Sequence, residues 1–384
     1  MRRFAFALVS AMVALAAPAG AAPARSTTAV ARPAVVVGFG YACGLSTSGT
    51  VKCWGATPGS TRPQLLPTTV SGISSVTAIA AAEDACVVVA SGAVKCWGYN
   101  RNGLRGDGTT TTAGAPTPVS GISTAVSIAV SDHACAVLKD ATVECWGDNT
   151  KGELGNGEFG SFSSTPVAAT GINDAIAVST GSQFTCVIRK DRTVWCWGRD
   201  SSGALGTGGP PLGKSLVPVK VKDLTGAVKL VSGGLTTCAL VLNGNVKCWG
   251  SNVSGQAGTG TSNYGRLPAP VKVDKVAHAI SISMGLDAGC GVVTGGTTKC
   301  WGTNDFGVQG TGILPDGVRH AENVVAVTHA VMVSAGFESA CALIADGTAR
   351  CWGMNDKGEL GTGGTNKDPR TAVVVKGLNL GAST

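Results

Sequence analysis

Short apolar stretches separated by turn residues recur along the whole chain. Segments of the type Pro-Val-x-Val, at 218–221 and 270–273, precede stretches of alternating apolar and small side chains such as 175–178. A segment with cysteine at both ends follows, and then a glycine-rich run, of which residues 147–157 are typical. Alternation over four to eight residues between turn signals predicts β-strands. The order predicts about four short strands per repeat of roughly 50 residues, with the Pro-Val segment as the first strand.

The tripeptide Cys-Trp-Gly sets the length of the repeat. It occurs seven times, and successive copies are 43, 49, 51, 52, 52 and 51 residues apart. Each copy is preceded by another cysteine, ten residues before its own. Sheets arranged radially bury both faces, because each sheet packs on its neighbours. The sequence therefore predicts an all-β fold, a seven-bladed β-propeller with four-stranded blades.

The two ends of the repeat array predict how the ring closes. The chain enters at 34–37, which corresponds to the second strand of the repeat, and ends at 369–378, which looks like the missing first strand. We expect this C-terminal strand to join blade one and cover its edge. Residues 22–384 are then a single propeller with about 50 residues per blade.

The first 21 residues have the composition of a secretory signal peptide. Arg2 and Arg3 precede an apolar run at 4–17, and small residues follow at 18–21. The run is shorter than the roughly 20 residues that span a bilayer, so we expect no membrane insertion. We expect residues 1–21 to be removed and the mature protein to be a secreted, extracytoplasmic monomer.

Composition and charge exclude several classes of protein. Glycine contributes 56 of the 384 residues and charged residues only 14%, which excludes a coiled coil and a charged disordered chain. The formal charge of +7 falls to +5 without Arg2 and Arg3 (7 − 2 = 5). A charge this dilute argues against nucleic acid as a partner.

The spacing of the paired cysteines predicts disulfide bonds. If residues 47–49 form a three-residue turn ending in a glycine with positive φ, Cys43 lies opposite Cys53, close enough for a disulfide. Ala141 and Arg192 replace that glycine in two repeats, where we expect a strained or altered turn. Metal binding is the weaker alternative, because the chain has no Cys-x2-Cys and only four histidines. All fourteen cysteines are predicted to pair within their repeats: Cys43 with Cys53, Cys86 with Cys96, Cys135 with Cys145, Cys186 with Cys196, Cys238 with Cys248, Cys290 with Cys300, and Cys341 with Cys351.

The tryptophans are predicted to pack between blades. In each Cys-Trp-Gly the indole points to the opposite side of the strand from its cysteine, as Trp54 does relative to Cys53. Inter-blade packing is favoured over an aromatic binding platform. Trp195 lies outside the pattern and is expected either to cap a blade or to be exposed.

The pattern resembles the repeat of the regulator-of-chromosome-condensation family, in a secreted, bacterial, cysteine-containing form. The resemblance rests on residues 341–363 and 135–157, which follow the family order of Cys-Ala-Leu, Asp-Gly, Cys-Trp-Gly and a closing Gly-x-Gly. It implies a seven-bladed propeller and says little about activity. Nuclear members of the family exchange nucleotide on a small GTPase, through loops that have no match here. Some secreted bacterial proteins with similar repeats inhibit β-lactamases.

No catalytic, cofactor-binding or metal-binding residue stands out. His133 occupies a variable repeat position, and no matching serine or aspartate motif accompanies the other histidines. An asparagine or aspartate recurs four residues after the second cysteine, as at Asn149 and Asp200. It is interpreted as starting the turn rather than binding calcium, because calcium loops carry more acids. We therefore predict no enzyme, no cofactor and no metal.

The glycine-rich turns and the loops that follow them vary most between repeats. Aromatic residues and arginine anchor many protein interfaces, and these segments carry eight of them: Tyr99, Arg101, Arg105, Phe159, Phe162, Tyr264, Arg266 and Phe306. Equivalent loops emerge on one rim of a propeller, so these side chains are a candidate interface. Tolerated surface insertions are an equally weighted interpretation.

The sequence favours a disulfide-stabilised propeller that acts as a binding module. The expected ligand is an unidentified protein or a cell-envelope polymer, held by preorganised loops. A proteinaceous inhibitor of an extracellular hydrolase is the first alternative. An enzyme with its site at the mouth of the central channel is the second, and two converging acids there would favour it.

Overall fold

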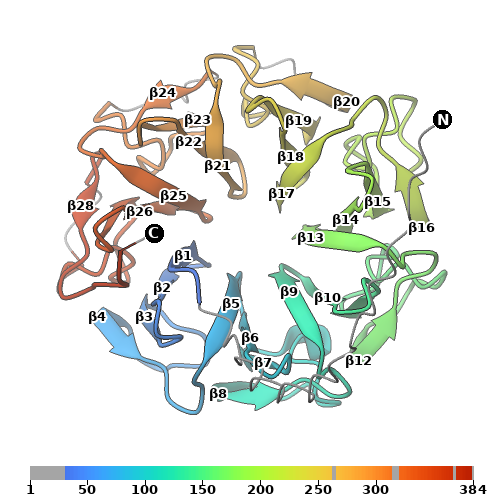
Figure 1. Cartoon of the computed structure of the whole chain (residues 1–384), viewed down its shortest axis with the longest axis horizontal. Coiled ribbons are helices and arrows are strands. Elements are labelled where there is room, and N and C mark those ends of the chain that lie inside the picture. The colour runs from blue at the N-terminus through green and yellow to red at the C-terminus, as the bar shows by residue number, and fades with distance from the viewer. Residues whose placement is uncertain (1–30, 262–264, 314–319, 366–368, 383–384) are drawn as a thin grey trace, which may run out of the picture.

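The computed structural model describes residues 31–261, 265–313, 320–365 and 369–382. Seven four-stranded antiparallel sheets stand around a central channel (Figure 1). The fold is the predicted all-β, seven-bladed propeller with four-stranded blades. The proposed signal peptide, residues 1–21, lies outside the described residues. None of the helices in the described part of the chain is long and apolar enough to cross a membrane.

Each blade is built from four consecutive strands of the chain, ordered from the channel outward (Figure 1). The inner strands are β1 (Ala34–Val37), β5 (Val76–Ala81), β9 (Ala125–Val130), β13 (Ala175–Gly181), β17 (Ala227–Gly233), β21 (Ala279–Met284) and β25 (Ala330–Ala335). The second strands are β2 (Tyr41–Leu45), β6 (Ala85–Val89), β10 (His133–Leu138), β14 (Phe184–Arg189), β18 (Thr236–Val241), β22 (Ala288–Val293) and β26 (Ser339–Ile344).

The third and outer strands complete the blades. The third strands are β3 (Val51–Gly55), β7 (Val94–Gly98), β11 (Val143–Gly147), β15 (Val194–Arg199), β19 (Val246–Ser251), β23 (Thr298–Gly302) and β27 (Ala349–Gly353). The outer strands are β4 (Gln64–Thr69), β8 (Ala113–Pro118), β12 (Ser163–Ala168), β16 (Lys214–Lys220), β20 (Arg266–Lys272), β24 (Glu322–Asn323) and β28 (Val373–Val374). One short 3-10 helix, η1 (Arg101–Gly103), lies in the connection between β7 and β8.

The hairpin of the second and third strands has the register expected from the cysteine spacing. Cys43 lies opposite Cys53, and Leu45 lies opposite Val51. The equivalent cysteines face each other in all seven blades, and each pair forms a disulfide. Ala141 and Arg192 keep the same turn, with positive φ angles of 69° and 61°. The hairpin register therefore survives the loss of glycine, and the two residues hold a backbone conformation that disfavours a Cβ.

The prediction that the Pro-Val segment is the first strand of a blade is wrong, and so is the predicted ring closure. The Pro-Val segment of β16 pairs with the third strand of its own blade, where Val219 lies opposite Cys196. It is therefore the last strand of a blade, not the first. Blade one already has β4 as its outer strand, and β28 pairs with β27 in blade seven. The C-terminal strand thus completes the last blade.

The residues after β28 join the last blade to the first. The backbone N–H of Leu380 donates to Gly347 of blade seven at 2.8 Å, and the Leu380 carbonyl accepts from Thr47 of blade one at 2.9 Å. Leu378 and Leu380 are buried in one cluster with Val35 of the innermost strand. Hydrophobic contacts and hydrogen bonds, two of them made by the backbone of Leu380, therefore hold this junction together without a shared sheet.

The tryptophans of the Cys-Trp-Gly tripeptides pack between blades, as the strand alternation predicts. Each is at most 2% exposed. In blade four, Trp197 Nε1 donates to the backbone carbonyl of Glu153 in the glycine-rich turn of blade three, at 2.7 Å. The same bond links Trp54, Trp146, Trp249, Trp301 and Trp352 to the blade before each of them. Trp195 is half-buried under the guanidinium of Arg189, 5.1 Å from the ring centroid.

Candidate functional site

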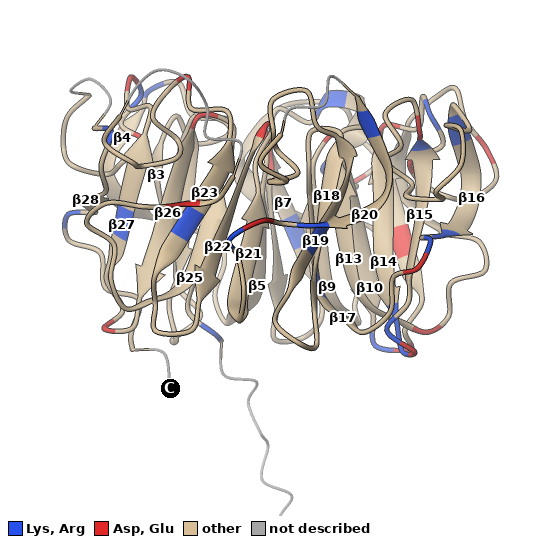
Figure 2. Ribbon diagram, turned by 90° about the horizontal axis from the view of Figure 1, so that it is seen from above, with Lys and Arg blue, Asp and Glu red and all other residues tan. Residues whose placement is uncertain are grey.

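The propeller has two ends that carry different kinds of connection. We call one end the loop face: it holds the turns between inner and second strands and the long connections between third and outer strands. The other end, the hairpin face, holds the disulfide-linked hairpin turns and the links from blade to blade. The strands run between these two ends, which form the upper and lower rims of the ring in the side view (Figure 2). The two ends also differ in which side chains they expose.

Six of the eight candidate interface residues lie at the loop face and are exposed or largely so. The exposed fractions are 46% for Tyr99, 55% for Phe159, 46% for Phe162 and 36% for Phe306. Arg101 and Arg266 are also exposed there, while Tyr264 lies outside the described residues. The six do not form one cluster. Tyr99, Arg101, Phe159 and Phe162 belong to blades two and three, whereas Arg266 and Phe306 belong to blades five and six, across the channel.

Arg105 is not an interface residue, because its side chain is buried. Only 5% of the residue is exposed, and its guanidinium pairs with Asp107 and donates to the Thr111 carbonyl at 2.9 Å. The residues at the same place in other glycine-rich turns, such as Leu154 and Leu205, are buried as well. Alignment of the repeats therefore contained the signal that the sequence analysis missed.

Two phenylalanines that the sequence analysis missed lie at the loop-face mouth of the channel. Phe39 and Phe337 are 45% and 37% exposed, and their rings meet edge to face with centroids 4.9 Å apart. They occupy one repeat position, four residues before the first cysteine, where the other blades have Ala82, Ser131, Ser182, Gly234 and Leu286. A cavity of about 260 Å³ lies between them and the opposite turns, and Glu83 and Asp132 also line it.

Acidic side chains follow this position in the inner turns. Three residues before the first cysteine the seven blades carry Gly40, Glu83, Asp132, Gln183, Leu235, Asp287 and Glu338, which gives four acids and no base. Burial raises the pKa of Asp132, and the charges of Asp148 and Glu83 raise it further. Burial and the charge of Asp305 likewise raise the pKa of Asp287. Two of these four acids, Glu83 and Asp132, line the cavity at the mouth, where carboxylates favour a cationic group.

The connections that carry the exposed aromatics are held by a repeated side-chain bond. Asn149 Oδ1 accepts the backbone N–H of Leu154 at 3.1 Å, and its Nδ2 donates to the Glu158 carbonyl at 3.2 Å. Asp200 makes the equivalent bond to Leu205 at 3.0 Å. These residues therefore start the turns, by bonding five residues ahead. Across the described residues, no group of three or more histidines, cysteines or acids is arranged to hold a metal ion.

Comparison with family models supports the resemblance seen in the sequence. Models of the regulator of chromosome condensation (RCC1) repeat match residues 175–204, 227–256 and 331–359 in one form, and 142–188 and 191–241 in another. The matches include the hairpins of blades four, five and seven and the glycine-rich turns of blades three and four.

Proteins with sequence similarity to this chain include a mitochondrial protein, a light receptor and a ubiquitin ligase. The mitochondrial RCC1 domain-containing protein RUG3 of Arabidopsis thaliana is 31% identical over 209 residues, 53% of this chain and 47% of that protein. The ultraviolet-B receptor UVR8 of the same plant is 28% identical over 212 residues, 52% of this chain and 45% of the receptor. Human E3 ubiquitin-protein ligase HERC2 is 35% identical over 140 residues, 36% of this chain and 3% of the ligase. The chain spans about half the length of the two plant relatives.

Solved structures share the fold at low sequence identity. A chain in the crystal structure of Kap60 bound to yeast RCC1 (Prp20) has a TM-score of 0.75 at 17% identity, covering 96% of this chain and 91% of that one. Human WBSCR16 has a TM-score of 0.72 at 18% identity, covering 82% of this chain and 85% of that one. Both comparisons support a propeller architecture and carry no information about the ligand.

Proposed function

Because the fold is a seven-bladed propeller and parts of the chain match RCC1 repeats, we propose that the protein is an interaction module that binds a protein partner on the loop face. The observation that carries the proposal is the pair Phe39 and Phe337, exposed beside acidic turns at the mouth of the channel. Exposed aromatic side chains in a preorganised pocket anchor protein interfaces at little entropic cost.

The chemistry of the mouth favours a partner that presents a positively charged side chain. Glu83 and Asp132 line the cavity beside the phenyl rings. Lys357 Nζ already lies 5.4 Å from the centroid of Phe39, so a cation and this ring are compatible. An anionic envelope polymer would meet like charges at the same place, which makes a basic protein segment the better ligand.

The compartment of the protein is part of the proposal. Seven disulfides in one chain are typical of proteins that fold in an oxidising environment. We propose that the protein acts outside the cytoplasm after its leader is removed. An inhibitor of an extracellular hydrolase is a special case of this function, in which the partner is the enzyme.

An enzyme remains the second candidate, because two carboxylates line one cavity. Glu83 forms an ion pair with Arg101 at 3.6 Å, and burial raises the pKa of Asp132. The substitution D132N separates the two functions. A binding module should keep most of its affinity for an aromatic-anchored partner, whereas an enzyme with Asp132 as its acid or base should lose turnover about a hundredfold or more.

Affinity capture from secreted and cell-envelope fractions tests the proposed function. The wild type is compared with the double variant F39A/F337A and with V126A/L242A, which removes two exposed apolar side chains from the hairpin face. Quantitative mass spectrometry should show partners lost by F39A/F337A and retained by V126A/L242A.

A defined probe completes the test. A short Arg- and Lys-rich peptide should bind the wild type more tightly than its Asp- and Glu-rich counterpart, and E83Q/D132N should remove the difference. Equal recovery of every partner by all three proteins, together with equal affinity for both peptides, would contradict the proposal.

A further inference from the structure

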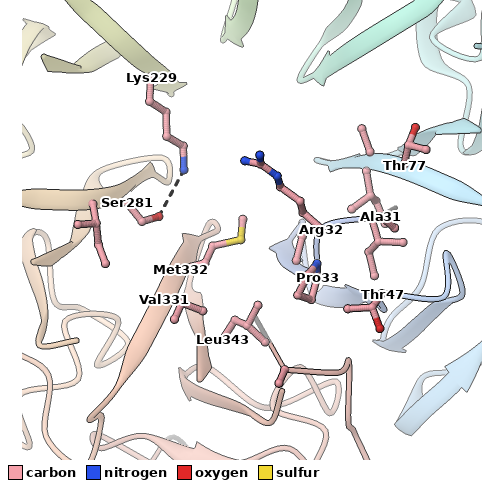
Figure 3. Close-up of a pocket in the computed structure, with 16 residues that line it drawn as sticks. Ala31, Arg32, Pro33, Thr47, Thr77, Lys229, Ser281, Val331, Met332 and Leu343 are labelled. Carbon is pink, nitrogen blue, oxygen red and sulfur yellow. Dashed lines mark hydrogen bonds between the residues drawn. The ribbon is translucent and has the colours of Figure 1, made fainter. Parts of the chain in front are cut away.

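The channel mouth on the hairpin face has chemistry opposite to that on the loop face. A cavity of about 1120 Å³ opens there between blades one, two, five, six and seven. Two cations, Arg32 and Lys229, are among the residues that line it, and none of the described lining residues is acidic. Both side chains extend into the open space from opposite sides of the mouth (Figure 3).

Lys229 breaks the repeat at its position. The equivalent residues of the inner strands lie opposite the second residue after the first cysteine: Ala34, Ala78, Ser127, Ala177, Lys229, Ser281 and Met332. Six of these seven are uncharged. Packing at the mouth therefore does not require a lysine, and a charge at this position needs another explanation.

The ammonium of Lys229 is poorly compensated. It donates to the neutral hydroxyl of Ser281 at 3.4 Å, and in the described part of the chain it forms no salt bridge. Burial lowers its pKa to about 8. An anion held between Lys229 and Arg32 would offset the lost solvation of the ammonium and form charge-assisted hydrogen bonds.

We propose that this mouth binds a small organic anion whose carboxylate or phosphate group contacts Lys229 and Arg32. The remainder of the cavity favours an apolar substituent, because Ile280, Val331 and Met332 line it beside the cations. Its volume is sufficient for a ligand of ordinary metabolite size. The site lies on the opposite face from the proposed protein interface and is independent of it.

Calorimetric titration with octanoate and with octyl phosphate tests the site and distinguishes the two anionic groups. Octylamine and octanol are the cationic and neutral controls of equal chain length. The variants K229Q and R32Q should each weaken binding of the preferred anion about tenfold. The matched variant K272Q removes a lysine from the outer strand of the same blade and should bind like the wild type.

The pH dependence of the affinity for the anion distinguishes the loss of the Lys229 charge from unfolding of the variant. Wild-type affinity should fall as the pH rises through about 8, where Lys229 loses its proton, and K229Q should abolish this dependence. Arg32 is the other charged group among the described lining residues. Unchanged binding by K229Q, equal binding of octylamine, or failure of the folded wild type to bind either anion would each overturn the proposal.

Discussion

The disulfide-linked hairpin is nearly constant among the seven blades, whereas the connection that follows it varies in length. The hairpin keeps a separation of ten residues between its cysteines in all seven blades. The connection to the outer strand runs from Gly55 to Gln64 in blade one, but from Gly302 to Glu322 in blade six. A covalently closed, buried hairpin fixes the frame, so the connections are free to carry different surface side chains.

The largest effect should come from opening one hairpin. The double variant C135A/C145A removes a disulfide that is fully buried in blade three. Chain entropy predicts a loss of about 3 kcal/mol in the free energy of unfolding, with lost packing added to it. Denaturant titration of the oxidised proteins measures this loss. The exposed outer-strand variant V217A should change stability by less than about 0.5 kcal/mol, and similar losses in both would contradict the comparison.

A smaller loss should follow from crowding the glycine-rich turn where it supports the next blade. Gly155 has a φ of +68°, and a Cβ there would lie 2.6 Å from Trp197 Nε1. G155A should therefore combine left-handed strain with overpacking, for a loss of about 2 to 3 kcal/mol. Gly157 in the same turn also has a positive φ, but a Cβ there meets nothing within 4 Å. G157A should cost about 1 kcal/mol, from strain alone.

The third prediction concerns pH, at the point where a hairpin meets the turn beside it. His133 Nε2 lies 2.6 Å from Thr185 Oγ1, and Thr185 donates to the Glu153 carbonyl at 2.9 Å. His133 Nδ1 is buried and has no hydrogen-bond partner among the described residues. Burial accordingly lowers the pKa of His133 to about 3, because a proton on Nδ1 would be unsatisfied.

As the pH falls, the unfolded chain binds a proton at His133 near pH 6.5, whereas the folded chain does so only near pH 3. Stability contributed by the neutral imidazole is therefore complete above that pH and is lost as the pH falls toward 3, by about 2 kcal/mol at pH 5. In H133T, which places the Thr236 side chain of blade five here, this part of the acid sensitivity should disappear. Burial raises the pKa of nearby Glu153 to about 7, which acts in the opposite direction and is common to both proteins. Parallel curves of unfolding free energy against pH would contradict the assignment.

The sequence predicts the register of each hairpin correctly, but it does not show to which blade an outer strand belongs. The register of a hairpin depends only on the short segment between its two cysteines. The position of the turn in this segment is therefore sufficient to place Cys43 opposite Cys53. The outer strand is separated from the hairpin by a long connection. A periodicity of about 50 residues does not define at which strand a blade begins. Contact between Val219 and Cys196, rather than any feature of the Pro-Val segment, assigns that segment to the preceding hairpin.

The sequence predicts the exposed aromatic residues of the long connections, but not the phenylalanine pair at the channel mouth. Exposure of the aromatics in the long connections follows from their variability, whereas the closeness of Phe39 and Phe337 depends on the meeting of the first and last blades. That contact spans nearly the whole chain, and no local pattern marks it. Arg105 is wrongly predicted as an interface residue, because arginine favours interfaces whereas this repeat position is buried in the neighbouring blades.

The smallest effect should appear within the hairpin itself, where two blades depart from glycine. Ala141 has a φ of 69° at the position where Gly49 has 77° in the first blade. A141G should raise stability by about 0.5 kcal/mol, because relief of left-handed strain slightly exceeds the added entropy of the unfolded chain. The reverse change, G49A, should destabilise, since a Cβ there would lie 2.9 Å from the backbone of Ser75 and Val76. A loss of stability in A141G would mean that the Ala141 methyl, which is 7% exposed, contributes more by packing than its backbone costs.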